Sequence, residues 1–199
     1  YDVHEKKMMN PRHFDRKRAG EFFCEVHRTF PNIGFRASFP NGFLVPKDDT
    51  IIMPIMRIMK IEQFATFCDI EDFGKHDLFK SVFVSDDKSL EDLRVLIREK
   101  YSDVFSVTTS GPSMLELMPL GVSKGYQIPY LKGLYPGAQL WCIGDYENDI
   151  EMLRAADVAV CPENAVDSVK EIAHIKVCHC KEGALAELID EIERRIDLK

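Results

Sequence analysis

The chain has 199 residues, of which 45% are hydrophobic and 30% are charged, a composition that suits one large or two modest globular domains. Its net charge of −7, with both signs interspersed, offers no broad basic surface, which argues against nucleic acid as the main partner. No apolar stretch approaches the roughly 20 residues that span a bilayer, so no membrane partner is expected. The six cysteines lie mostly in apolar runs, which favours reduced thiols and a cytoplasmic location.

Hydrophobic periodicity predicts an α+β module with antiparallel strands in the first part of the chain. Helices are expected over residues 14–29, 50–68 (apolar, methionine-rich and broken at Pro54) and 89–100. Strands are expected over residues 1–3, 34–39, 42–45, 81–85, 104–109 and 114–118.

The second part of the chain alternates short apolar strands with helices, which favours a parallel, doubly wound sheet. Strands are expected over residues 138–143, 157–161 and 174–178. Helices are expected over residues 123–134 (kinked or ended early by Pro129), 147–155, 164–172 and 183–196. In such sheets, ligands bind beyond the carboxyl ends of the strands, so the residues that follow each strand are the first candidates for a site.

A cluster of polar residues follows the first strand of this second part. Asp145, Glu147, Asn148 and Asp149 come within six positions after an apolar run and a glycine. Carboxylates at a strand end repel one another unless a cation lies between them, and Mg²⁺ is usually held by one or two carboxylates together with water and substrate phosphate. The turn is therefore a candidate Mg²⁺ site.

The acidic turn has two other possible interpretations. Acidic residues are favoured in the first turn of any helix by the helix dipole, so the cluster could be a solvated helix start. A calcium loop of the EF-hand kind requires glycine at its sixth position and glutamate at its twelfth. Counted from Asp145, those positions hold Ile150 and Ala156, which excludes that loop.

A positively charged residue that could complement the acids lies about twenty positions upstream. Ser123 is a candidate N-cap, Lys124 follows it, and Gly125 allows the backbone to approach a ligand closely. A lysine at a helix start could bind phosphate and neutralise the charge that develops in phosphoryl transfer. A lysine near a helix start is by itself most often a surface charge. Its occurrence together with the acidic turn makes the two segments a more specific indication of a phosphate-binding site.

These motifs together resemble a known family. Gly-Val-Ser-Lys-Gly at 121–125, Gly-Asp-Tyr-Glu-Asn-Asp-Ile-Glu-Met-Leu at 144–153, Ala-Asp-Val-Ala-Val at 156–160 and Asn-Ala at 164–165 resemble the carboxyl half of a haloacid-dehalogenase-superfamily hydrolase. The Cof-type phosphatases, which carry a large α/β cap inserted into a Rossmann-like core, are the most similar branch. The likeness is good over residues 113–199 and rests on element order alone over 1–112.

The resemblance implies an α/β fold with two domains. Residues 1–119 would form an α+β cap with an antiparallel sheet that sets substrate specificity, and residues 120–199 the carboxyl-terminal part of the core with its parallel sheet. It also implies roles in the site: Lys124 contacts phosphate and takes part in catalysis, Asp145 binds Mg²⁺, and Asn148 contacts phosphate or substrate. Asp149 supports the metal and the lysine and is taken as both catalytic and metal-binding. Glu147 receives no role.

One part of the family's chemistry has no counterpart in the sequence. The family attacks phosphorus with the first aspartate of an Asp-x-Asp-x-Thr/Val motif, and no such motif occurs in these 199 residues. The expectation is therefore that the chain lacks the amino-terminal core segment, that it is inactive alone, and that this segment or another chain covers the exposed edge of the core sheet. An apolar unpaired edge would otherwise favour aggregation.

The leading functional hypothesis is a Mg²⁺-dependent phosphatase of small phosphorylated metabolites such as sugar phosphates, acting through an aspartyl phosphate. The alternatives are a catalytically inactive relative that binds a ligand or regulates a partner, and a phosphotransferase or mutase on the same core. Zinc binding by His174, Cys178, His179 and Cys180 was also weighed, but strand alternation sends neighbouring side chains to opposite faces.

Overall fold

The computed structural model describes residues 11–85 and 88–197, and these fall into two compact units, residues 1–122 and residues 123–199. The strand expected at residues 1–3 lies outside the described residues. In unit 1 the helices are α1 (Arg16–Thr29), α2 (Ile52–Ile58) and α3 (Ser89–Lys100), with 3₁₀ helices Glu62–Phe64 and Ile70–Lys75. Its strands are β1 (Gly34–Phe39), β2 (Gly42–Pro46), β3 (Ala65–Cys68), β4 (Lys80–Val84), β5 (Phe105–Gly111) and β6 (Met114–Pro119).

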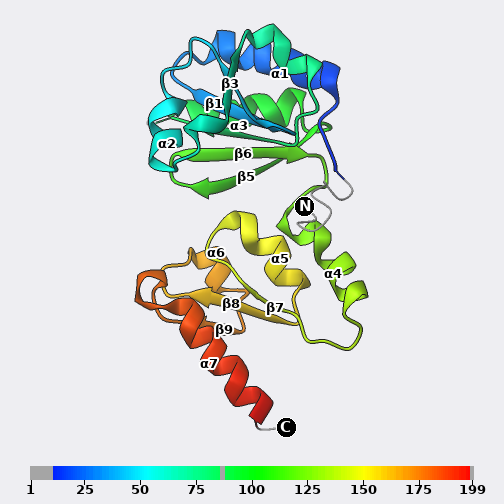
Figure 1. Ribbon diagram of the computed structural model, residues 1–199, viewed down its shortest axis with the longest axis vertical. Coiled ribbons are helices and arrows are strands. Elements are labelled where there is room, and N and C mark those ends of the chain that lie inside the picture. The colour runs from blue at the N-terminus through cyan, green and yellow to red at the C-terminus, as the bar shows by residue number, and fades with distance from the viewer. Residues whose placement is uncertain (1–10, 86–87, 198–199) are drawn as a thin grey trace. The chain divides into compact units, whose positions relative to one another are not determined.

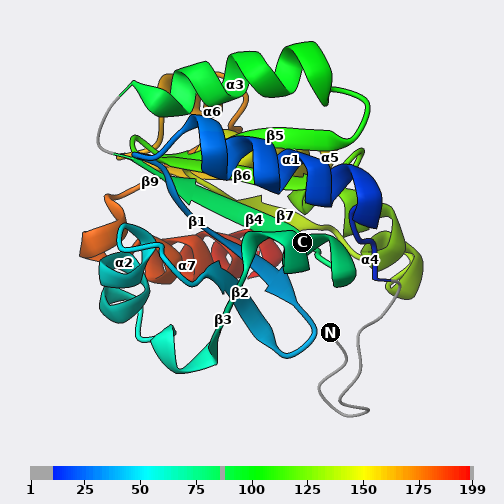
Figure 2. The same cartoon turned by 90° about the horizontal axis from the view of Figure 1, so that it is seen from above.

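Unit 1 is built on a six-stranded sheet in the order β3-β2-β1-β4-β6-β5. All neighbouring pairs are antiparallel except β2 and β3, which are parallel. Figure 1 shows α1 and α3 together on one face of this sheet, and Figure 2 shows them lying over that face. The predicted antiparallel module is thus confirmed, with one parallel edge strand added.

The core of unit 1 lies between the sheet and α1 and is dominated by phenylalanine. Alternation along β1 sends Phe35 and Ala37 to this face, where they meet Phe22 and Phe23 from α1. The helix begins at Asp15, whose side chain accepts a hydrogen bond of 2.9 Å from the Arg18 backbone N–H. A smaller apolar cluster under α2 packs on the opposite face.

The methionine-rich stretch is the largest error in the predicted elements of unit 1. A helix was expected over 50–68, but α2 ends at Ile58, and the chain then enters a 3₁₀ turn and the edge strand β3. Lys60 has a φ of 56°, a left-handed conformation that no α-helix continues through. Met56, a residue of α2, is fully buried, whereas Met59 is half exposed, so only part of the stretch is core.

Unit 2 holds three parallel strands in the order β7-β8-β9, as the sequence predicted. The strands are β7 (Trp141–Ile143), β8 (Val158–Pro162) and β9 (Ile175–Val177). The helices are α4 (Ile128–Leu134), α5 (Ile150–Ala155), α6 (Asp167–Lys170) and α7 (Ala184–Asp197), with 3₁₀ helices Lys124–Gln127, Glu147–Asp149 and Cys180–Glu182.

The helices of unit 2 cover both faces of its sheet. Ile128, Leu153 and Val169 from α4, α5 and α6 pack on one face, and Ala184 and Leu188 from α7 pack on the other (Figure 1). Pro129 lies in the first turn of α4, where its missing N–H costs no hydrogen bond. The residues before it form a separate 3₁₀ turn, which confirms the interruption expected there.

No helix of the described residues is long and apolar enough to cross a bilayer.

Candidate active site

The acidic turn begins where β7 ends, at the carboxyl edge of the parallel sheet. The backbone passes from Ile143 through Gly144 into Asp145, and the 3₁₀ helix Glu147–Asp149 then leads into α5. Asp149 is only 4% exposed, whereas Asp145 and Glu147 are exposed and Asn148 is half-buried. The turn thus buries one carboxylate and leaves the other two at the surface.

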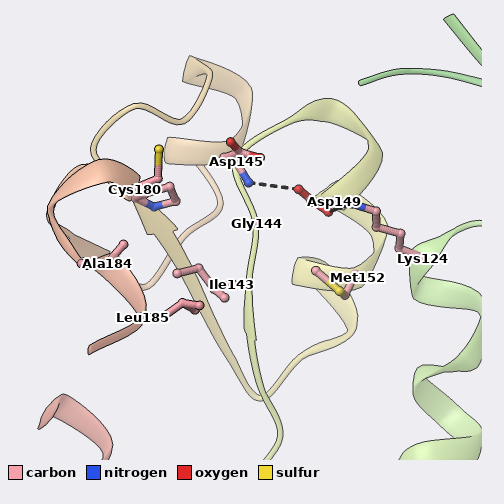
Figure 3. Close-up of a pocket in the computed structure, with 11 residues that line it drawn as sticks. Lys124, Ile143, Gly144, Asp145, Asp149, Met152, Cys180, Ala184 and Leu185 are labelled. Atoms are coloured by element: carbon pink, nitrogen blue, oxygen red, sulfur yellow. Dashed lines mark hydrogen bonds and ion pairs between the residues drawn. The ribbon is translucent and has the colours of Figure 1, made fainter. Parts of the chain in front are cut away.

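Both carboxylate oxygens of Asp149 are engaged. Oδ2 accepts hydrogen bonds from the backbone N–H groups of Asp145 (3.0 Å) and Tyr146 (3.3 Å), and Oδ1 lies 2.6 Å from Lys124 Nζ. Burying a carboxylate is costly unless it is paired and hydrogen-bonded, and here each oxygen has a partner. Asp149 therefore closes the turn around Asp145 and holds Lys124 at the same time (Figure 3).

Two glycines make this arrangement possible. A Cβ at Gly144 would lie 2.4 Å from Asp149 Cβ and 2.6 Å from its Cγ, so any side chain there would displace the buried acid. A Cβ at Gly125 would lie 2.7 Å from the Glu151 backbone carbon, so only glycine lets the segment after Lys124 approach α5 this closely. The glycines beside the lysine and the aspartate are thus explained by packing within unit 2.

A cavity of about 580 Å³ lies at this edge of the sheet. Lys124, Asp145 and Asp149 form its polar part, and Ile143, Met152 and Leu185 are among its apolar lining residues (Figure 3). The remaining lining residues are Gly144, Pro162, Cys180, Gly183 and Ala184. Asn148, predicted as a phosphate or substrate contact, is not among them.

The loop after β9 also lines the cavity. The sequence did not predict that this loop belongs to the site. The Cys180 backbone N–H donates to Asn164 Oδ1 at 2.9 Å, which ties this loop to the segment that follows β8. Gly183 has a φ of 98°, a left-handed conformation that allows the sharp entry into α7. The Asn-Ala pair at 164–165 was the only sequence signal that could have pointed to this loop.

His174 and Cys178, considered above as zinc ligands, make hydrogen bonds within unit 2. His174 Nδ1 accepts a hydrogen bond of 3.0 Å from the Ala159 backbone N–H. The thiol of Cys178 has a raised pKa, first because of its hydrogen bond with Glu187 and then because of burial. Within residues 11–85 and 88–197, no group of three or more His, Cys, Asp or Glu side chains is placed to hold a metal ion.

The chain is similar to known hydrolases and phosphatases. Residues 3–189 match the haloacid dehalogenase-like hydrolases. The chain is 27% identical over 125 residues to the HMP-PP phosphatase of Citrobacter koseri, covering 61% of this chain and 46% of that protein. It is 28% identical over 95 residues to the 5-amino-6-(5-phospho-D-ribitylamino)uracil phosphatase YwtE of Bacillus subtilis, covering 47% of this chain and 33% of that protein.

The fold has close counterparts among solved structures. A haloacid dehalogenase-like hydrolase from B. subtilis superposes with a TM-score of 0.77 at 18% identity, covering 94% of this chain and 74% of that one. The chain spans less than half the length of the two curated relatives above. The match over nearly all of its residues, together with the fold, shows that the chain belongs to the haloacid dehalogenase-like hydrolase family.

Proposed function

We propose that this chain supplies the lysine-bearing and acidic part of the active site of a Mg²⁺-dependent phosphatase that hydrolyses small phosphorylated metabolites, such as sugar phosphates. The observation that carries this proposal is the connection of Lys124, Asp149 and Asp145 at the carboxyl edge of a parallel sheet, around one cavity. The two curated relatives described above, an HMP-PP phosphatase and a 5-amino-6-(5-phospho-D-ribitylamino)uracil phosphatase, support it.

Lys124 is proposed to bind the phosphate group. Its side chain is 49% exposed although its ammonium group is paired with Asp149, so it can still meet a ligand at the cavity. Asp149 fixes the position of the ammonium group before a substrate arrives, and preorganised positive charge is the chief means of stabilising a phosphoryl-transfer transition state. Asn148 is proposed to contact substrate from the same turn.

The donor set around Asp145 fits Mg²⁺ in part. Asp145 presents an exposed carboxylate at the cavity, and one or two carboxylates with water and substrate oxygens are what Mg²⁺ prefers. Bound there, the ion would neutralise charge on the phosphate. Asp149 would have to release Lys124 or a backbone N–H to coordinate directly, so its assignment as a ligand stays a prediction and its proposed role is to orient Asp145 and Lys124.

The nucleophile is proposed to lie outside these 199 residues, because they contain no Asp-x-Asp-x-Thr/Val motif. In the described sheet of unit 2, β7 pairs with β8 on one side only. We propose that the segment carrying the nucleophile, or another chain, covers the second edge of β7. Residues 1–119 would then act as the cap that sets specificity. The six free cysteines support the proposed cytoplasmic setting.

The test is a panel of phosphomonoesters offered to the full-length gene product and, separately, to this chain. The full-length protein should hydrolyse at least one member of the panel in Mg²⁺, lose activity in EDTA and recover it when Mg²⁺ is restored. The chain alone should release no phosphate. A full-length protein that binds phosphorylated ligands without hydrolysing them would support an inactive relative, and phosphate transferred to an acceptor other than water would indicate a phosphotransferase or mutase.

A further inference from the structure

One face of the unit 1 sheet carries charged side chains at its centre. Arg36 of β1 is in register with Val82 of β4, and Val82 is in register with Glu116 of β6. Since Phe35 and Ala37 point into the phenylalanine core, alternation places Arg36 on the opposite face, where Val82 packs in the cluster under α2. Arg36 and Glu116 therefore stand on the face that α1 and α3 leave uncovered (Figure 1).

Arg36 is a buried residue whose guanidinium group has no hydrogen-bonding partner among the described residues, and the nitrogen atoms of that group are not sealed from solvent. The residue is 9% exposed, and its Cζ atom lies 4.1 Å from the centre of the Phe43 ring. Throughout the described part of the chain, no hydrogen bond or ion pair engages the guanidinium; only the more distant charge of Glu116 acts on it. Burial lowers the pKa of Arg36, and the charge of Glu116 opposes that effect.

Glu116 is already paired with another residue. Its Oε2 lies 2.7 Å from Lys80 Nζ, and its side chain is 10% exposed. The three side chains Arg36, Lys80 and Glu116 together carry one net positive charge at neutral pH. Holding a charge on a largely buried side chain without a partner is unfavourable. Because its nitrogen atoms are not sealed from solvent, this guanidinium can still meet an acceptor, which these residues do not provide.

The shape and charge of this cluster indicate the kind of acceptor. A guanidinium presents donors in a planar fork that matches the two oxygens of a carboxylate. One negative charge would balance the cluster, whereas a phosphate dianion would leave an excess negative charge beside Glu116. Ser38 and Thr108 lie on the same face, in register with Lys80 and Glu116, and both are half-buried rather than sealed in the core.

We propose that Arg36 is the centre of a binding site for the carboxylate group of a small molecule, on the face of the unit 1 sheet that β1, β4 and β6 form, with Lys80 and Glu116 at its side. The site lies wholly in unit 1 and uses none of the residues assigned to phosphate or Mg²⁺. It therefore stands or falls independently of the proposed phosphatase activity.

The test is an NMR titration of the Arg36 Nε–Hε resonance in the whole chain, assigned by its loss in Arg36→Lys. Glycolate is the carboxylate probe, and sodium chloride at matched ionic strength and inorganic phosphate are the comparisons. The resonance should shift saturably with glycolate and only slightly with chloride. Spectral changes at Ser38 and Thr108 should follow the same binding curve, vanish in Arg36→Met and persist in the control Arg57→Met, since Arg57 is exposed on α2.

Several results would overturn the site. These are an absence of saturable change with glycolate, an equal response to chloride, and saturation by phosphate alone, which would show that the site does not prefer a carboxylate.

Unfolding in urea gives a second measurement, because methionine keeps an apolar contact with Phe43 while removing the charge of this largely buried side chain. Arg36→Met should unfold at the same or a higher urea concentration than the parent, and a marked loss would show that the guanidinium has a structural partner instead.

Discussion

Lys124 and Asp149 are 25 positions apart in the sequence, yet Lys124 Nζ lies 2.6 Å from Asp149 Oδ1. The same aspartate receives the Asp145 backbone N–H through its other oxygen, so one buried side chain joins the predicted phosphate contact to the predicted metal ligand. Asp149 is thereby assigned to positioning both of them, and this assignment has measurable consequences for stability as well as for activity.

Removing the charge of Asp149 should destabilise unit 2. Asp149→Asn keeps the volume but loses one acceptor oxygen and the charge that Lys124 meets, leaving buried donors without full partners. We expect a loss of about 1–3 kcal/mol in the free energy of unfolding. Urea denaturation followed by the fluorescence of Trp141, the only tryptophan, would measure it in unit 2. Glu147→Gln, on the same turn but exposed, should change stability by no more than about 0.5 kcal/mol.

Adding a methyl group at Gly144 should disturb the site from within. In Gly144→Ala the new Cβ would overlap Asp149, so either the turn moves or the acid leaves its pocket. A cost of roughly 1–3 kcal/mol or more is expected, by the same fluorescence assay. Gly133→Ala is the matched control, because Gly133 lies in α4 with no atom within 4 Å of a Cβ. That change should be neutral or stabilise by up to about 1 kcal/mol, and equal losses in the two variants would contradict the packing argument.

The outer edge of β7 should exchange its amide hydrogens quickly in this chain alone. Gly144 N–H donates to Val160 at 3.2 Å and the Leu140 carbonyl accepts from Val158 at 3.1 Å, so alternation turns the N–H groups of Trp141 and Ile143 away from β8. Hydrogen exchange resolved by residue should show these two amides unprotected and that of Val160, in the central strand, protected. Strong protection of Trp141 and Ile143 in the isolated chain would mean that the edge is already covered, by self-association for example.

Unit 1 contains an acid that should contribute to stability in a defined pH range. The pKa of Glu25 is lowered by its hydrogen bonds from Lys100 and from Tyr101, the latter 2.8 Å long. A lowered folded pKa means that the stabilisation is present above the unfolded value and is lost as the pH falls through the folded value. A carbon-13 NMR titration should place its midpoint below 4.5, the ordinary value.

The size of this effect is modest because the pair lies near the surface. Glu25→Gln should cost about 1 kcal/mol or less at neutral pH and progressively less in acid. Glu21, exposed on the same helix, supplies the control substitution Glu21→Gln, which should leave the free energy of unfolding unchanged at neutral pH and in acid. A Glu25 midpoint above 4.5 would contradict the role given to Lys100 and Tyr101.

Hydrophobic periodicity and turn-forming residues were enough to predict most helices and strands. The prediction failed where the local sequence pattern and the tertiary contacts favour different structures. The stretch from Ile51 to Cys68 is mostly apolar, so its composition could not show that it changes from helix to edge strand after the left-handed Lys60. In unit 2 the alternation of strands and helices predicted a parallel sheet, and the structure confirms it.

The candidate site was predictable as a list of residues but not as an arrangement. Motif spacing singled out Lys124, Asp145 and Asp149, whereas the division of labour between the two acids depends on which one is buried. The sequence drew attention to Cys180 only as a possible zinc ligand and not as part of a loop that lines the cavity. The unpartnered charge of Arg36 has no local signal, since a single arginine in a strand does not reveal whether another side chain will reach it. Both depend on contacts between segments distant in the sequence.

Lys124, held by Asp149, is proposed to act on phosphate. The most direct measurement is the steady-state rate of phosphomonoester hydrolysis by the full-length gene product in Mg²⁺, compared among the parent, Lys124→Met and Glu147→Gln. We expect Lys124→Met to lose roughly 10²–10³-fold in kcat, the usual cost of removing one preorganised charge-stabilising donor, and Glu147→Gln to keep the parent rate. A folded Lys124→Met variant that hydrolyses the same substrate at the parent rate would contradict it.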